Sequence, residues 1–248
     1  RLSYNGIVMG SMGSGKSTLL KKIGSDRAIR GDIVRGFDVT GEFRALTEAH
    51  GGKTISLDGS DGIINPLHVF RTAEDEQTSF TMHLSKIANF YRFIAPEADD
   101  GEVKEFENLV HSLYVEKGMW EEELTQNKKQ ITNLANDAYP VFTDLLVLIR
   151  EELYSNLEKK IQHDNLSQQR RNRLENMELT IHTLVRSYGK LFDGHTSIEK
   201  FQEEQVIYFE IKQLAGMKSE IFQAQMFNVT NLLWDELLQK GLPQKEAF

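Results

Sequence analysis

Residues 10–17 constrain this chain more than any other feature of its sequence. They read Gly-Ser-Met-Gly-Ser-Gly-Lys-Ser and fit the pattern G-x-x-x-x-G-K-[ST] at every fixed position. Such a loop surrounds phosphates with backbone N–H groups, and its glycines allow the close approach. The lysine of this pattern reaches the β- and γ-phosphates, and the final hydroxyl binds Mg²⁺. The sequence therefore predicts a nucleotide-binding loop.

The residues expected to bind the nucleotide run from the first glycine to the residue after the motif. They are Gly10, Ser11, Met12, Gly13, Ser14, Gly15, Lys16, Ser17 and Thr18. Ser17 is the expected magnesium ligand. Both flanks suit the loop, because residues 6–9 are an apolar run that predicts a buried strand, and residues 18–23 predict a helix that starts near Ser14. The start of such a helix directs its N-terminal dipole at a bound anion. These flanks disfavour the alternative, a glycine-rich turn with a chance lysine.

Strands and helices alternate after the loop. Residues 32–38 and 53–57 predict strands, and residues 42–50 predict a short helix that ends at Gly51. Strand, helix and strand in this order imply a parallel sheet. Pro66 then takes the chain out of the sheet, because proline cannot continue a central ladder.

The middle of the chain is helical in pattern. It is polar and nearly free of proline, and its apolar residues recur at helical spacing. The expected helices lie within residues 80–91, 103–116, 142–161 and 167–188. A strand at 205–211 and an amphipathic helix at 220–240 then restore the α/β pattern. The expected fold class is therefore α/β, a parallel sheet with a large inserted all-α subdomain. Its expected parts are a first sheet part (1–70), the insertion (71–190) and a return to the core (191–248).

Composition limits the remaining function classes. The 248 residues include no cysteine, which excludes disulfides and thiolate metal sites. The net charge of −8 argues against a generally basic surface for nucleic acid. The densest basic stretch, residues 168–173, is interpreted as a solvated helix face rather than a nucleic-acid contact, because no aromatic platform is interleaved with it. Trp120 and Trp234 are expected to anchor the core.

Four sequence features together resemble a known family. They are the loop and its helix start (10–19), Phe-Asp-Val-Thr-Gly-Glu-Phe at 37–43, Gly51-Gly52 before a strand, and Asn65-Pro66-Leu67. Their order and spacing closely resemble those of the VirB-type ATPases of conjugative and type IV secretion systems, in the HerA/FtsK superfamily. The resemblance continues beyond the helical block, through residues 191–194, 206–211 and 226–234.

This resemblance implies a RecA-like P-loop NTPase core, hexamer formation, and ATP with Mg²⁺ as the ligands. It implies a motor domain that energises conjugative DNA transfer or type IV secretion, cytoplasmic and peripherally associated with the inner face of the cell membrane. The implied partners are further copies and other components of a membrane-associated complex, with DNA contacted only weakly or indirectly. The chain starts about one strand before the loop, so the family's N-terminal domain is expected to be missing from it. Its Walker B strand, which ends in Asp-Glu, is expected beyond Phe248, so the chain is interpreted as a fragment that is incomplete for hydrolysis.

Three residues are expected to take part in hydrolysis, namely Lys16, Asp38 and Glu42. The two acids follow the strand after the first helix, at the sheet edge from which side chains can reach a γ-phosphate. Glu42 either orients the attacking water, as a glutamate in RecA-like proteins does, or only favours the first turn of its own helix. Asp38 is expected to contact Lys16, Ser17 or bound water. The alternative that Glu210 is the Walker B acid is disfavoured, because a single acid after an apolar strand is common.

Other functions compatible with the loop are a DNA pump of the FtsK or HerA kind and a non-catalytic module that uses nucleotide only to order an interface. A small-molecule kinase is disfavoured, because the helical block offers no arginine-rich lid over the phosphates.

Overall fold

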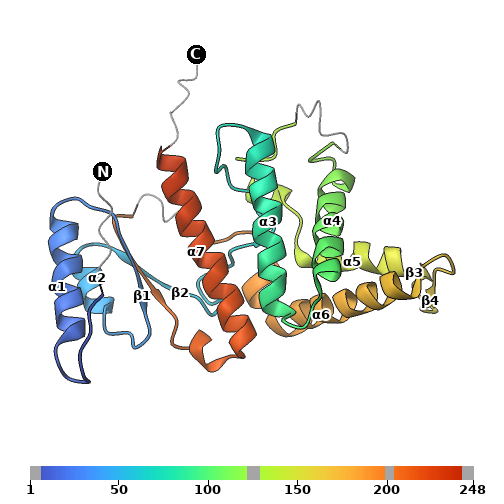
Figure 1. Cartoon of the computed structure of the whole chain (residues 1–248). Helices are drawn as coiled ribbons and strands as arrows, with labels where there is room; N and C mark the ends of the chain where they lie inside the picture. Colours follow the sequence, from blue (N-terminus) through green and yellow to red (C-terminus); the bar gives the residue numbers. More distant parts are fainter. Residues whose placement is uncertain (1–6, 122–128, 199–203, 242–248) are drawn as a thin grey trace, which may run out of the picture. The chain divides into compact units, whose positions relative to one another are not determined.

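The computed structural model describes residues 7–121, 129–198 and 204–241 (Figure 1). Residues 1–57 and 200–214 form one compact unit, here called the sheet unit. Residues 58–199 and 215–248 form a second, here called the helical unit. The chain thus leaves the first unit at residue 57 rather than at the expected 70, and α7 belongs to the helical unit.

The described part of the sheet unit contains three parallel strands, which confirms the predicted parallel sheet. They are β1 (Val34–Asp38), β2 (Lys53–Ser56) and β5 (Val206–Glu210), in the order β1-β5-β2. Asp38 of β1 and Ser56 of β2 both pair in register with Glu210 of β5. The carboxyl ends of all three strands therefore lie at one edge of the sheet.

The central position of β5 follows from its sequence, because Val206-Ile207-Tyr208-Phe209 is apolar and buried on both faces. Helices α1 (Lys16–Ile29) and α2 (Arg44–Ala49) complete the unit. Val206 and Tyr208 pack with Ala28 of α1 and with Phe43. Gly36 of β1 has no space for a side chain, since a Cβ there would lie 2.4 Å from the Tyr208 ring.

The strand predicted at residues 6–9 is wrong where the structure tests it. Gly6 lies outside the described residues, and residues 7–9 have no regular structure. The Ile7 and Met9 side chains are each 82% exposed. An apolar run becomes a strand only where a neighbouring strand completes its hydrogen bonds, and none of the described strands pairs with these residues. Helix α1 begins at Lys16, two residues later than expected.

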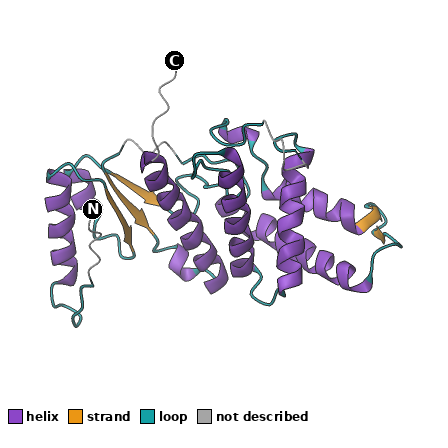
Figure 2. Ribbon diagram, turned by 45° about the horizontal axis from the view of Figure 1, so that its top comes forward, coloured by secondary structure: helices purple, strands orange, loops and turns teal. Residues whose placement is uncertain are grey.

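Long helices build the described part of the helical unit (Figure 2). They are α3 (Glu76–Ile94), α4 (Asp100–Glu116), α5 (Phe142–Leu153), α6 (Gln168–Phe192) and α7 (Ser219–Gly241). Helix α3 packs against both α4 and α7, and α5 packs along α6. Side chains of Asp75, Asp99 and Ser167 cap the first turns of α3, α4 and α6. The 3-10 turns at Asn136–Ala138 and Leu214–Gly216 lie outside these helices.

Helix α5 is shorter than predicted, because it ends at Leu153 instead of continuing to residue 161. A small antiparallel hairpin follows, made of β3 (Tyr154–Asn156) and β4 (Ile161–Gln162). The Asn156 side chain accepts a hydrogen bond of 2.9 Å from the backbone N–H of Lys159, and Lys160 has a φ of 50°. Asparagine favours such turns because its side chain can replace a backbone acceptor.

Two further expectations need correction. Trp120 is buried, but Trp234 is 57% exposed and does not anchor the core. The basic stretch at the start of α6 is not simply solvated, because Arg170 makes ion pairs of 2.8 Å with both Glu105 and Glu152. Arg170 thus joins α6 to α4 through Glu105 and to α5 through Glu152. No helix among the described residues has the length and apolar character needed to cross a bilayer.

Candidate nucleotide-binding site

The loop before α1 has the backbone conformation that its glycines permit. Gly13 has a φ of 80° and Gly15 a φ of 86°, both in the left-handed region. A Cβ at either position would meet no atom within 4 Å, so the backbone angle and not lack of space requires glycine. Gly15 is the residue directly before α1. The amides of the first helical turn have no acceptor inside the helix, and an anion can accept from them.

Lys16 turns its side chain back over this loop. Its Nζ donates hydrogen bonds to the carbonyl oxygens of Gly10 at 2.8 Å and Ser11 at 2.7 Å. The ammonium group is exposed there, and the loop from Met9 to Ser14 is exposed as well. A cation held by two exposed carbonyl groups can change partners when an anion arrives.

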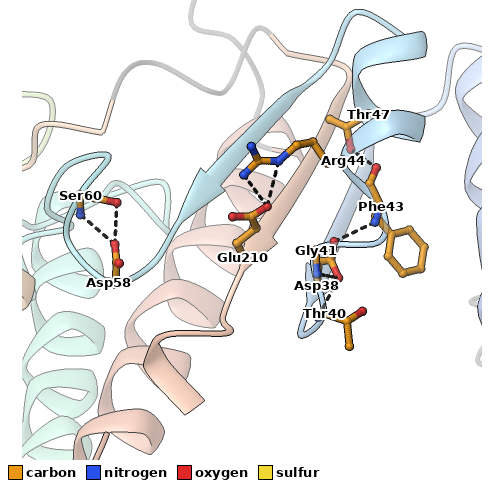
Figure 3. Close-up of polar contacts among 9 residues, drawn as sticks. All are labelled: Asp38, Thr40, Gly41, Phe43, Arg44, Thr47, Asp58, Ser60 and Glu210. Carbon is orange, nitrogen blue, oxygen red and sulfur yellow. Dashed lines mark hydrogen bonds and ion pairs between the residues drawn. The ribbon is translucent and has the colours of Figure 1, made fainter. Parts of the chain in front are cut away.

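Asp38 organises the loop between β1 and α2 (Figure 3). One carboxylate oxygen accepts from the backbone N–H groups of Thr40 at 3.1 Å and Gly41 at 2.9 Å, and the other accepts from the N–H of Phe43 at 2.8 Å. Asp38 is 2% exposed, and Gly41 provides the necessary turn with a φ of 81°. These contacts all lie within the loop itself. The expected contact of Asp38 with Lys16 or Ser17 is not among the described interactions.

Glu42 is brought to the first turns of α1 by this loop. Its carboxylate accepts from Lys21 Nζ at 3.3 Å. A hydrogen bond from the Ser17 side chain, and next to it the Lys21 ammonium, hold the pKa of Glu42 below its ordinary value. Glu42 is therefore ionised beside the hydroxyl that the sequence pattern assigns to magnesium.

Glu210 lies at the carboxyl end of the central strand and has a cationic partner. Arg44 donates to one oxygen of Glu210 through Nε at 3.2 Å and a terminal nitrogen at 2.8 Å (Figure 3). Sequence reasoning missed this pair, because 166 residues separate its members. Glu210 lies near the end of a predicted strand, but Arg44 lies in the helix predicted at residues 42–50, so no local signal linked the two.

The described residues around the loop offer oxygen atoms rather than a preformed metal site. Among them, no group of three or more histidine, aspartate or glutamate side chains converges to hold a metal. Protein-bound Mg²⁺ commonly takes one or two protein oxygens and completes its shell with phosphate oxygens and water. The Ser17 hydroxyl and the Glu42 carboxylate supply such oxygens next to the loop.

Comparison with known proteins supports the fold. No family model matches the chain. The chain is 31% identical over 258 aligned residues to an uncharacterized protein of Bacillus anthracis, pXO2-09, and the alignment covers 99% of this chain. The structure of VirB4 of Thermoanaerobacter pseudethanolicus superposes with a TM-score of 0.73 and 20% identity over 93% of this chain. This chain spans 39% of the length of the first protein and 55% of the second. It therefore has a VirB4-like α/β fold, with a parallel sheet and many helices.

Proposed function

We propose that this chain is the ATP-binding and ATP-hydrolysing motor domain of a conjugative DNA-transfer or type IV secretion machine. The observation that carries the proposal is the loop before α1. Gly13 and Gly15 have left-handed backbone angles there, and the Lys16 ammonium lies over the loop at the start of the helix. The VirB4-like fold supports it independently of the loop sequence.

The chain's own residues have separate tasks in this proposal. The amides of the first turn of α1 bind phosphate oxygens, and Lys16 exchanges the carbonyl groups of Gly10 and Ser11 for phosphate. Ser17 offers its hydroxyl to the magnesium ion. Bound MgATP supplies the phosphoanhydride bond whose hydrolysis releases energy.

The loop between β1 and α2 supplies the acidic part of the site. Glu42 is ionised and exposed, so it is able to accept a hydrogen bond from a water molecule and orient it. Asp38 acts through its three backbone contacts, which hold Glu42 toward α1. Asp38 is thus a positioning residue in this proposal.

The assembly and location belong to the same proposal. A RecA-like hexamer would place an arginine from a neighbouring copy near the nucleotide, and the machine would dock at the inner face of the cell membrane with other secretion components. Direct contact with DNA is expected to be weak, because the net charge is −8.

The test compares two lysines of the same helix. We expect Lys16→Ala to weaken binding of a fluorescent ATP analogue at least tenfold, because a phosphate-binding charge is lost from the loop. Lys22→Ala is the matched control, since it removes the same charge from an exposed pair with Asp26 at 3.4 Å. Equal binding by the unmodified chain and Lys16→Ala would refute the nucleotide site.

One observation favours a second candidate, a module that binds nucleotide without hydrolysing it. Residues 7–9 do not join the sheet, and Lys16 contacts its own loop, so ligand binding could serve to order this region. Measurement of phosphate release by the full protein separates the candidates. Hydrolysis that Lys16→Ala abolishes supports the motor, and tight binding without hydrolysis supports the module.

A further inference from the structure

The side chains of Ser17 and Lys21 are one helical turn apart on α1. Lys21 contacts Glu42 directly, and a hydrogen bond from Ser17 lowers the pKa of the same carboxyl. Positions i and i+4 of a helix lie on the same face, so α1 presents a hydroxyl and an ammonium group side by side. The Lys21 Nζ is 3.3 Å from a Glu42 carboxylate oxygen. The same ammonium lies 5.5 Å from the centre of the Phe43 ring.

The position of Glu42 is set by its neighbours and not by Lys21 alone. Asp38 fixes the loop through three backbone N–H groups. Phe43, the next residue, is buried and stacks on the Tyr208 ring with 4.7 Å between the ring centres. Removal of the Lys21 side chain therefore leaves Glu42 next to α1.

Lys21 thus supplies a positive charge beside two oxygen ligands of the kind that Mg²⁺ prefers, a carboxylate and a hydroxyl. The Lys21 and Glu42 side chains are 34% and 38% exposed, and an ion pair this exposed is weak. A divalent cation can replace the lysine there, because its double charge attracts the carboxylate more strongly.

We propose that Lys21 is a placeholder cation, which balances the charge of the Glu42 carboxylate beside Ser17 until the magnesium ion of the bound nucleotide displaces it. This inference rests on the proposed nucleotide site and assigns Glu42 to the surroundings of the metal ion. The Lys21 ammonium then competes with magnesium for the Glu42 carboxylate.

The experiment measures the Mg²⁺ concentration that gives half-maximal change in fluorescence of a bound, non-hydrolysable ATP analogue, with the analogue saturating and the full chain used. We expect Lys21→Ala to lower this concentration by up to about fivefold, the range that an exposed ion pair allows. Lys21→Arg keeps the charge and should behave as the unmodified chain. Glu42→Gln should raise the concentration, because it removes the carboxylate.

Lys22→Ala is again the matched control, because it removes a neighbouring charge that pairs with Asp26 instead of Glu42. The inference is overturned if Lys21→Ala and Lys22→Ala shift the magnesium midpoint equally, or if Lys21→Ala raises it. In either case the unmodified chain still binds the analogue, so the proposed function stands. Failure of the unmodified chain to bind it at any magnesium concentration refutes both.

Discussion

Replacement of Asp38 should selectively destabilise the sheet unit. Its carboxylate accepts three backbone hydrogen bonds, but their losses are unequal. Thr40 is exposed and Gly41 half-buried, so water can reach their N–H groups, whereas Phe43 is buried. A buried N–H group that loses its acceptor costs about 1–3 kcal/mol. We expect Asp38→Asn, which keeps one oxygen and turns an NH₂ group toward Phe43, to cost about 2 kcal/mol.

Asp38→Ala removes all three acceptors and should cost about 3 kcal/mol or more, because hydrogen bonds to a charged group are the stronger ones. Asp32→Asn is the control, since it removes an acid from an exposed pair with Arg27 at 3.2 Å and should change stability by less than about 0.5 kcal/mol.

The assay must report on the sheet unit, and tryptophan fluorescence does not, because Trp120 and Trp234 both belong to the helical unit. Hydrogen exchange of peptides that cover residues 34–57 gives the local free energy of opening. A loss of about 2 kcal/mol speeds exchange about thirtyfold. Exchange in Asp38→Ala no faster than in Asp32→Asn would refute the assigned role of the carboxylate.

Two further predictions concern the helical unit, where tryptophan fluorescence in urea is the suitable probe. Lys86 forms an ion pair with Asp235, which is 4% exposed, and Lys86→Met should cost about 3–5 kcal/mol because it leaves a buried carboxylate unpaired. Burial raises the pKa of Asp235, so the deficit should shrink as the pH falls and the carboxyl is protonated; a deficit that is constant with pH would contradict this. Burial also lowers the pKa of His68 from 6.5 to about 4, so the folded unit excludes a proton that the unfolded chain binds. His68 should therefore contribute about 3 kcal/mol to the loss of stability between pH 6.5 and 4. Burial lowers the pKa of His83 to about 3 in the same unit, so His68→Gln should reduce the fall by about 3 kcal/mol without removing it. An unchanged slope in that variant would contradict the assignment.

Local sequence patterns were sufficient for much of this structure. The apolar runs predicted β1, β2 and β5, and Gly51, which has a φ of 63°, marks the end of α2 as expected. Local patterns failed where the structure depends on a partner that is distant in the sequence. Residues 7–9 are as apolar as a strand requires, yet no described strand pairs with them. The ion pair between Arg44 and Glu210 likewise depends on a register that only the folded sheet provides.

In the candidate site, too, local motifs were predicted and contacts between distant residues were missed. The loop glycines and Lys16 are fixed by a contiguous motif, so the sequence revealed them, and their ligand stays a prediction. The contact between Lys21 and Glu42 was missed, although Lys21 stands four residues after Ser17 and therefore on the same helix face. The contacts of Asp38 were missed because they go to backbone amides, which carry no sequence signal.

The sheet shows how such a long insertion is tolerated. Strand β5 lies between β1 and β2, although the whole helical block separates Ser56 from Val206 along the chain. Closing a long flexible loop costs free energy that grows only with the logarithm of its length. The helical unit reduces even that cost, because the segment by which the chain enters it, at Ile63, is hydrogen-bonded to the segment by which the chain leaves it, at Ser197. The N–H of Ser197 donates to the carbonyl oxygen of Ile63 at 2.9 Å, and the Ile63 N–H donates to the Ser197 hydroxyl at 3.0 Å. Once the helical unit has folded, β2 and β5 are joined as though by a short connection.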